Sequence, residues 1–172
     1  MKDLYLIDGY NVIFCLTEIF DSDDLDAERK RLIDLMEDFG AHNDLEVIVV
    51  FDGKGKYLKS DVQNISQEFQ VVYTPAKMTA DSYIEKESYY RRKEYRSIYV
   101  VTSDGAEQNQ ILGNGAYRMA VSELFRMWKE DKEVQSKFIK QHNLANKRNE
   151  IGKNVPEYVR DKLNQLRKRG KR

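Results

Sequence analysis

Three aspartates in this sequence stand at or just beyond the ends of short apolar runs. Asp8 follows LYLI, Asp52 follows VIVVF, and Asp104 follows SIYVV after a Thr-Ser pair. A fourth acid, Asp81, lies in KMTADSYIEKE, within the expected first turn of a helix. If the apolar runs are parallel strands of one sheet, their carboxyl ends meet at one edge, and all four carboxylates lie along it.

Carboxylates that converge in this way repel one another, and a divalent cation is the usual means of neutralising them. Ligands that are all oxygen suit Mg²⁺ or Mn²⁺ better than zinc. The chain holds only two histidines, His42 and His142, and one cysteine, Cys15, so a zinc site or a histidine-pair nuclease is not expected. Hard cations on carboxylates serve phosphate chemistry, in which a metal activates water and a second metal, about 4 Å away, steadies the leaving oxygen.

Each acid also has a purely structural interpretation. Asp-Gly is a common turn pair, which accounts for Asp8 and Asp52. Asp81 favours a helix N-terminus with Thr79 as the cap, and Asp104 does the same if Ser103 caps the next helix. The four acids together favour the metal site more than any one of them does alone.

Asn11 lies three residues after Asp8, where a helix is expected to start. It is predicted to hold the Asp8 loop or to touch a phosphate. A third interpretation, compatible with both, is that Asn11 caps that helix.

The hydrophobic pattern predicts the elements that would position these residues. Short apolar runs alternate with segments of helical periodicity, which is typical of an α/β domain with a mostly parallel sheet. The expected strands are 4–7, 47–51, 69–73 and 97–101, with a possible edge strand at 116–121. The expected helices are 25–39, 79–93, 104–112, 122–142 and 156–167, with a loop at 143–153.

Length and charge predict one domain with an extension. A chain of 172 residues is long enough for one sizeable core. Residues 1–136 hold 17 lysines and arginines against 26 acids, whereas residues 137–172 hold 12 against 3. We therefore expect an acidic body at 1–136 and a basic helical extension at 137–172. Such a tail favours a polyanionic partner such as nucleic acid, although a solvated tail that aids solubility is the alternative.

The sequence gives no sign of export or of a membrane. No apolar run approaches the roughly 20 residues that span a bilayer. The N-terminus MKDLYLIDGYN carries aspartates where a signal peptide would be apolar. With one cysteine and no export signal, a cytoplasmic protein is expected.

Four motifs carry a resemblance to a known family. IDGYN (7–11), FDG (51–53), TADS (79–82) and TSD (102–104) resemble the NYN domains, relatives of the PIN-domain ribonucleases, in the family's order. The YacP-like subgroup is the most similar, and its characterised member is an endoribonuclease that cleaves mRNA in the ribosomal A site. The resemblance implies a three-layer PIN-like α/β fold, Mg²⁺ or Mn²⁺, and hydrolysis of RNA phosphodiester bonds.

The resemblance also implies roles for particular residues. Asp8, Asp81 and Asp104 match the family's metal-binding acids. Asp52 matches a further acid of less defined role, and Asn11 matches the asparagine of the N-terminal motif.

Residues around Asp104 are assigned supporting roles. Ser103 and Gln108 are expected to support the metal site without binding the metal. Glu107 would either bind the metal or form a capping box at the start of its helix, and the capping box is favoured.

Basic residues are candidates for contacts to the RNA backbone. The lysines of the loop after Asp52 are expected to contact RNA, and the alternative is that this loop is only solvated. The basic residues near the end of the chain are also expected to contact RNA. The basic residues at the end of the helix that begins near Thr79 would lie about 15 Å from the metal. They would either hold a phosphate two or three nucleotides along the strand or only complement the helix C-terminus. The candidates are Lys54, Lys56, Lys59, Arg91, Arg92, Lys93, Arg167, Lys168 and Arg169.

Tyrosines near the end of that helix have two interpretations. Tyr83, Tyr89, Tyr90 and Tyr95 would stack on bases or, at helical spacing, pack on the core, and packing is favoured for most of them.

The sequence therefore predicts a metal-dependent endoribonuclease. Its expected partners are mRNA and, through the subgroup resemblance, the ribosome, with no membrane and no small-molecule cofactor. The alternative is a non-catalytic RNA- or ribosome-binding module on the same fold.

Overall fold

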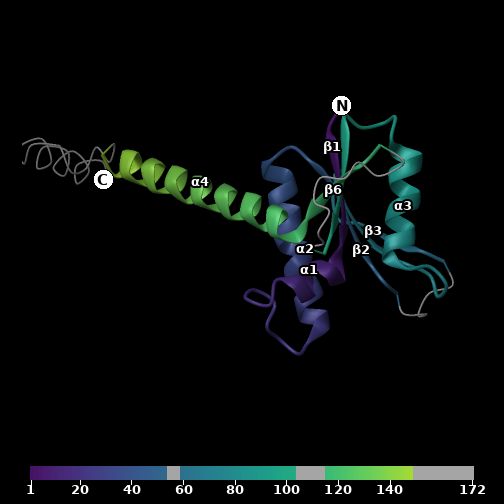
Figure 1. Ribbon diagram of the computed structural model, residues 1–172. Coiled ribbons are helices and arrows are strands. Elements are labelled where there is room, and N and C mark those ends of the chain that lie inside the picture. Colours follow the sequence, from purple (N-terminus) through teal and green to yellow (C-terminus); the bar gives the residue numbers. More distant parts are fainter. Residues whose placement is uncertain (54–58, 104–114, 149–172) are drawn as a thin grey trace, which may run out of the picture. The chain divides into compact units, whose positions relative to one another are not determined.

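Six strands form one sheet in the part of the chain that the computed structural model describes, residues 1–53, 59–103 and 115–148 (Figure 1). Their order across the sheet is β3-β4-β2-β1-β5-β6, and every neighbouring pair is parallel except β3 with β4. The strands are β1 (Asp3–Asp8), β2 (Glu46–Phe51), β3 (Asp61–Asn64), β4 (Phe69–Tyr73), β5 (Ser97–Thr102) and β6 (Tyr117–Ala120). The strand that ends in Asp8 therefore lies between the strands that precede Asp52 and Ser103.

Helices cover both faces of this sheet, which gives three layers. The helices are α1 (Gly9–Cys15), α2 (Leu25–His42), α3 (Ala80–Arg91) and α4 (Val121–Arg148). Alternate residues of each central strand point to opposite faces. On one face Tyr5 and Ile7 join a core with residues of α1, α2 and the first turns of α4, and on the other Leu4 and Leu6 join a core with α3. The continuous apolar runs are explained by this two-sided burial.

The predicted three-layer α/β fold with a mostly parallel sheet is confirmed. The apolar runs at 4–7, 47–51, 69–73 and 97–101 are all strands, and the edge strand near 116–121 is present as β6. The sequence DVQN of β3 was not predicted, because this edge strand is mostly exposed and carries no apolar pattern.

Two helical expectations need comment. The loop predicted at 143–153 is wrong for residues 143–148, which continue α4 as helix. Polar, Asn-rich residues are compatible with a helix, so their composition did not exclude one here. The helices predicted at 104–112 and 156–167 lie outside the described residues.

The chain divides into two units, Met1–Lys129 and Glu130–Arg172, and the division falls within α4. The first unit contains the whole sheet. The predicted boundary between a body and a basic extension at 136/137 stays a prediction. Among the described helices, none combines the length and the apolar character that a membrane span requires.

Candidate active site at the carboxyl end of the sheet

Asp8 is both the last residue of β1 and the N-cap of α1. Its Oδ1 accepts a hydrogen bond from the backbone N–H of Asn11 at 3.1 Å, and its Oδ2 accepts one from Asn11 Nδ2 at 2.9 Å. Asn11 thus holds the Asp8 carboxylate by both oxygens, as one of the predicted roles required. The suggestion that Asn11 itself caps the helix is wrong, because Asp8, three residues earlier, is the N-cap.

Gly9 allows the chain to turn from β1 into α1 against the ring of Phe51. A Cβ at position 9 would lie 2.7 Å from Phe51 Cδ1 and 2.8 Å from Cζ, and closer still to Cε1. Phe51 is fully buried, with Tyr10 edge-on at 5.2 Å and Tyr73 stacked at 5.6 Å between ring centroids. Only glycine fits here, so the glycine of the IDGYN motif is explained by packing rather than by an unusual backbone angle.

Asp52 follows β2, the strand beside β1, and is half-buried. Thr74, which is fully buried, fixes the chain on both sides of it. The Gly53 N–H donates to Thr74 Oγ1 at 3.2 Å, and the Thr74 N–H donates to the Phe51 carbonyl at 3.0 Å. The position of Asp52 is therefore set by the pairing of β2 with β4.

Asp81 lies in the first turn of α3 and is exposed. Thr79 caps this helix, as predicted, and accepts a hydrogen bond from the Ser82 N–H at 3.2 Å. A carboxylate in the first turn is favoured by the helix dipole, so the same placement serves helix stability and the candidate site.

Electrostatics connect three of these acids. Burial is the largest cause of a raised pKa at Asp8, and the charges of Asp81 and Asp52 raise it further. Hydrogen bonds from the backbone N–H groups of Asn11 and Tyr10 oppose the shift. Asp52 and Asp81, which are far from Asp8 in the sequence, are therefore close enough at the sheet edge to disfavour the charged form of Asp8.

The rest of the predicted site is only partly described. Ser103 follows β5 directly and is exposed. Asp104, Glu107 and Gln108 lie outside the described residues. Within residues 1–53, 59–103 and 115–148, no group of three or more Asp, Glu, His or Cys side chains is arranged to hold a metal ion. The Asp8, Asp81 and Asp104 metal set therefore stays a prediction.

The described donors nevertheless fit a hard cation. Asp8, Asp81 and Asp52 offer carboxylate oxygens, which are the donors that Mg²⁺ and Mn²⁺ prefer. A carboxylate has about four lone-pair positions, so the two hydrogen bonds from Asn11 leave Asp8 with acceptor capacity on each oxygen. A bound cation would also relieve the repulsion that raises the pKa of Asp8.

The predicted RNA-binding cations differ in their surroundings. Arg91 turns to other side chains of its own unit: its Nε donates to Glu87 at 2.7 Å and its Nη1 lies 3.7 Å from Glu46. Arg92 and Lys93 are exposed just beyond the end of α3, and Lys59 is exposed beyond β2. These contacts favour a structural role for Arg91, while its role in RNA binding stays a prediction.

The remaining candidates are in the undescribed parts of the chain. These are Lys54, Lys56, Arg167, Lys168 and Arg169.

Three residues that support the site were not singled out from the sequence. Thr74 holds the end of β2, and Tyr10 packs on Phe51 while its hydroxyl accepts a hydrogen bond from Arg29 Nη1 at 2.7 Å. Tyr10 could have been noticed as the one aromatic inside IDGYN. Thr74 and Arg29 give no local signal, because their partners are distant in the sequence.

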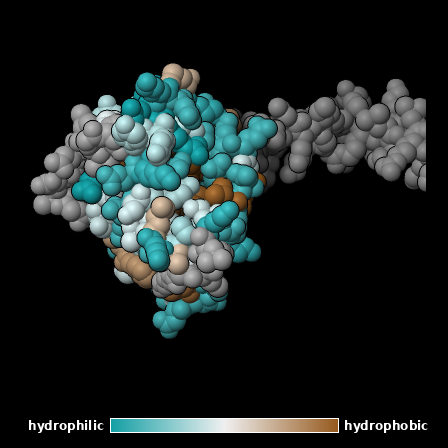
Figure 2. Space-filling view, turned by 90° about the vertical axis from the view of Figure 1, so that its right-hand side faces the viewer, coloured by the Kyte–Doolittle hydropathy of each residue, from teal (hydrophilic) through white to brown (hydrophobic). Residues whose placement is uncertain are grey.

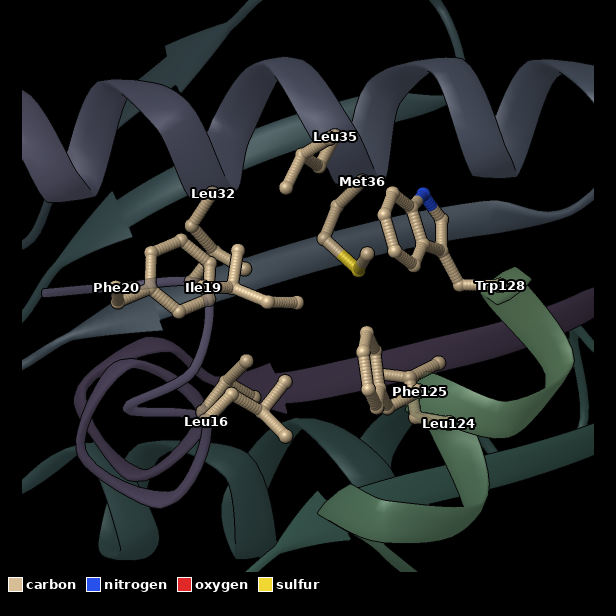
Figure 3. Close-up of a pocket in the computed structure, with 10 residues that line it drawn as sticks. Leu16, Ile19, Phe20, Leu32, Leu35, Met36, Leu124, Phe125 and Trp128 are labelled. Atoms are coloured by element: carbon tan, nitrogen blue, oxygen red, sulfur yellow. The ribbon is translucent and has the colours of Figure 1, made fainter. Parts of the chain in front are cut away.

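An apolar pocket lies beside this region, between α2, the segment after α1 and the first turns of α4 (Figure 3). Figure 3 shows side chains from these three segments pointing toward one another. The pocket is lined by Val12, Leu16, Ile19, Phe20, Leu32, Leu35, Met36, Leu124, Phe125 and Trp128. Such a lining offers packing rather than chemistry, so no catalytic group is assigned to it.

Comparisons with known proteins identify a family and its relatives. A family model described as the YacP-like NYN domain matches residues 5–168. Protein YacP of Bacillus subtilis (strain 168), which is described as uncharacterized, is 34% identical over 129 residues, which cover 72% of this chain and 74% of that protein.

Two solved structures show the same fold. The crystal structure of Rae1 (YacP) from Bacillus subtilis matches with a TM-score of 0.67 at 27% identity, over 98% of this chain and 95% of Rae1. A mutant of the same protein matches with a TM-score of 0.68 at 29% identity, over 82% of this chain and 83% of that one. The predicted PIN-like three-layer architecture is confirmed by this likeness.

Proposed function

Because the chain belongs to the YacP-like NYN domain family, we propose that it is a metal-dependent endoribonuclease that hydrolyses phosphodiester bonds in mRNA. Family membership supports a nuclease-type, RNA-related function. The observation that carries the proposal further is the placement of Asp8 and Asp52 at the carboxyl ends of two neighbouring parallel strands, with the charges of Asp52 and Asp81 both acting on Asp8. Ligands of such sheets bind at this edge, and clustered acids there serve to hold a cation.

In this proposal Asp8, Asp81 and Asp104 hold Mg²⁺ or Mn²⁺. When bound, the cation supplies Lewis-acid stabilisation of a phosphate oxygen and makes a nearby water more acidic. Asn11 fixes the direction of both Asp8 oxygens, and the Thr79 cap fixes the turn that carries Asp81. Asp52 adds negative charge beside Asp8 and strengthens the preference for a divalent ion.

Association with the ribosome is the finer part of the proposal. It rests on the YacP-like subgroup, whose characterised member acts on mRNA in the ribosomal A site. The basic residues of 137–172 are the proposed contact to RNA or to the ribosome, since this segment carries 12 lysines and arginines against 3 acids.

The experiment that tests the proposal is cleavage of one mRNA with and without translating ribosomes, in Mg²⁺ and in EDTA. We expect cleavage in Mg²⁺, recovery with Mn²⁺ after chelation, and none in EDTA. Asp8→Asn and Asp81→Asn should each abolish cleavage and leave RNA binding intact. Asp34→Asn, which changes an exposed acid on α2, is the matched control and should cut like the wild type.

Three outcomes would contradict the proposal. Cleavage that persists in EDTA would exclude the metal. Wild-type cleavage by Asp8→Asn would exclude the site. RNA binding without any cleavage, with ribosomes present, would leave a non-catalytic RNA-binding module instead.

A further inference from the structure

We propose that Tyr89 and Tyr90 on α3 form a stacking surface for unpaired RNA bases, flanked by Lys86, Arg92 and Lys93. We call these five residues the α3 aromatic patch. This inference rests on the proposed function, because it names where the RNA strand runs after it leaves the acidic site. It differs from that function in concerning base contacts rather than the cleavage chemistry.

Exposure separates the four tyrosines on and just beyond α3. Tyr83 and Tyr95 are partly buried and pack against the core that holds α3 on the sheet. Tyr89 and Tyr90 are 51% and 66% exposed, respectively. The packing that explains the first pair therefore does not explain the second, and large exposed aromatics side by side mark an interaction surface.

Cations are placed against both exposed rings. The Arg92 guanidinium carbon lies 4.1 Å from the centroid of the Tyr89 ring, and Arg92 Nη1 donates to the Tyr89 carbonyl at 2.8 Å. Lys86 Nζ lies 6.0 Å from the centroid of the Tyr90 ring. The two rings meet edge to face with centroids 5.7 Å apart.

This arrangement matches the chemistry of single-stranded RNA. Aromatic rings and arginine planes both stack on unpaired bases, while cations beside them neutralise phosphates. The edge-to-face contact leaves the two rings facing different directions, so they would take different bases rather than one.

Tyr89 connects the patch to the exposed row of α3 that begins at Asp81. Within α3, Asp81, Glu85 and Tyr89 follow one another at a spacing of four, and all three residues are exposed. At 1.5 Å per residue, Tyr89 is about 12 Å along the helix from Asp81. A strand held at the acidic site can therefore reach the patch within a few nucleotides.

Charge on the exposed side of α3 changes along the helix. Asp81 and Glu85 stand in its first half, whereas Lys86, Arg92 and Lys93 stand in its second half and just beyond it. Figure 2, which views the molecule from the side on which α3 lies in Figure 1, shows a mainly hydrophilic surface there. An acidic half that attracts a cation and a basic, aromatic half that attracts RNA are complementary to one substrate.

Arg91 provides an internal contrast to its neighbour. It interacts with Glu87 and Glu46 and is oriented toward the body of its unit. The basic run Arg91-Arg92-Lys93 thus divides into one structural arginine and two exposed cations. Only the latter belong to the patch.

The test measures binding of a fluorescent single-stranded oligonucleotide by anisotropy in EDTA, where no cleavage is expected. Stacking contributes roughly a 5- to 150-fold gain in affinity per base, so Tyr89→Ala and Tyr90→Ala should each weaken binding within that range. Tyr89→Phe and Tyr90→Phe keep the ring and should bind like the wild type. Tyr117→Ala removes a partly exposed tyrosine of β6, on the other face of the sheet, and is the matched control.

Two further measurements identify what is recognised. An oligonucleotide of equal length with abasic positions should bind the wild type and the tyrosine variants alike, because it offers no base to stack. Arg92→Ala and Lys93→Ala should each lower the slope of log affinity against log salt by about 0.7, whereas the tyrosine variants should keep the wild-type slope.

The outcomes distinguish this inference from the proposed function. Wild-type RNA affinity in the tyrosine-to-alanine variants, with RNA cleavage intact, would overturn the patch and leave the nuclease standing. If these variants keep the wild-type affinity for RNA but bind ribosomes more weakly, the patch contacts a ribosomal protein instead of RNA bases. In the cleavage assay, a higher KM with unchanged kcat in the tyrosine variants supports the patch. A lower kcat with unchanged KM argues against it. No RNA binding by the wild type would overturn both proposals.

Discussion

Replacing Gly9 with alanine should damage the fold and the candidate site together. The added Cβ would lie 2.7 and 2.8 Å from two ring carbons of Phe51, and nearer to a third. The ring has little room to retreat, because it is fully buried with Tyr10 on one side and Tyr73 on another. The turn that carries Asp8 must therefore move instead.

The expected magnitude follows from two opposing effects. One excess methyl group in a packed core costs about 1–3 kcal/mol. Replacing a helical glycine with alanine returns at most about 1 kcal/mol, and less in the first turn. The net loss of unfolding free energy is about 1–2 kcal/mol, which at about 2–4 °C per kcal/mol lowers Tm by about 2–8 °C. A shift of Asp8 by about 1 Å should lower the cleavage rate about 100-fold.

The assay combines thermal unfolding with cleavage rates measured at 25 °C, where the variant remains folded. Gly40→Ala is the control: its Cβ would meet a Val47 methyl group at 2.9 Å and nothing else nearer than 3.7 Å. Gly40→Ala should also lower Tm, because the Val47 side chain is buried. Gly40 lies near the start of β2, away from the carboxyl edge, so the cleavage rate at 25 °C should stay close to that of the wild type.

A double variant isolates the contact. Leucine at position 51 lacks the outer ring carbons, so Gly9→Ala should cost little stability when combined with Phe51→Leu. Equal costs of Gly9→Ala in both backgrounds would refute the steric argument. A lower Tm with an unchanged cleavage rate would show that the contact packs the core without positioning Asp8.

Three further variants test other contacts. The raised pKa of Asp8 means that the folded, metal-free protein keeps this proton when the unfolded chain has lost it, so this group's contribution to stability falls as pH rises above about 4. Asp8→Asn, which preserves the cap, should raise the metal-free Tm at pH 7, and this gain should vanish in acid; a lower Tm at pH 7 would contradict the electrostatic argument. Arg91→Ala should cost about 1 kcal/mol by unpairing Glu87, about 2–4 °C in Tm, while Arg92→Ala should be close to neutral, and similar losses would show that Arg91 is not structural. Thr79→Ala should cost about 1 kcal/mol in urea denaturation and Thr79→Ser little, whereas equal losses would mean that the methyl group, not the cap, matters.

Much of the fold was predictable from local patterns. The runs LYLI, VIVVF, FQVVY and SIYVV are apolar because both faces of their strands are covered, and each is a strand in the structure. Thr79 was identified as a cap from its type and place alone. DVQN escaped prediction because an exposed edge strand needs no apolar residues. Residues 143–148 were assigned to a loop because polar, Asn-rich composition is common in loops, yet it is also compatible with a helix.

The residues of the candidate site could be predicted from the sequence better than the contacts between them. The types and positions of Asp8, Asp52 and Asp81 indicated a carboxylate edge, and the raised pKa of Asp8 supports their proximity. That Asn11 would hold the Asp8 loop was one of three alternatives, and the structure shows that it does so through both its backbone and its side-chain donor. Thr74 could not be found, because its hydrogen bonds cross between strands that lie more than twenty residues apart.

What the sequence by itself determined is which residues can do chemistry and which segments are strands or helices, because residue type and periodicity are properties of neighbouring positions. The tertiary structure alone decided that β1 lies between β2 and β5, which brings Asp8 beside Asp52. It also decided that Gly9 must lack a side chain, and that Arg91 faces inward while Tyr89 and Tyr90 face solvent. These facts depend on contacts between segments distant in the chain, which no local pattern specifies.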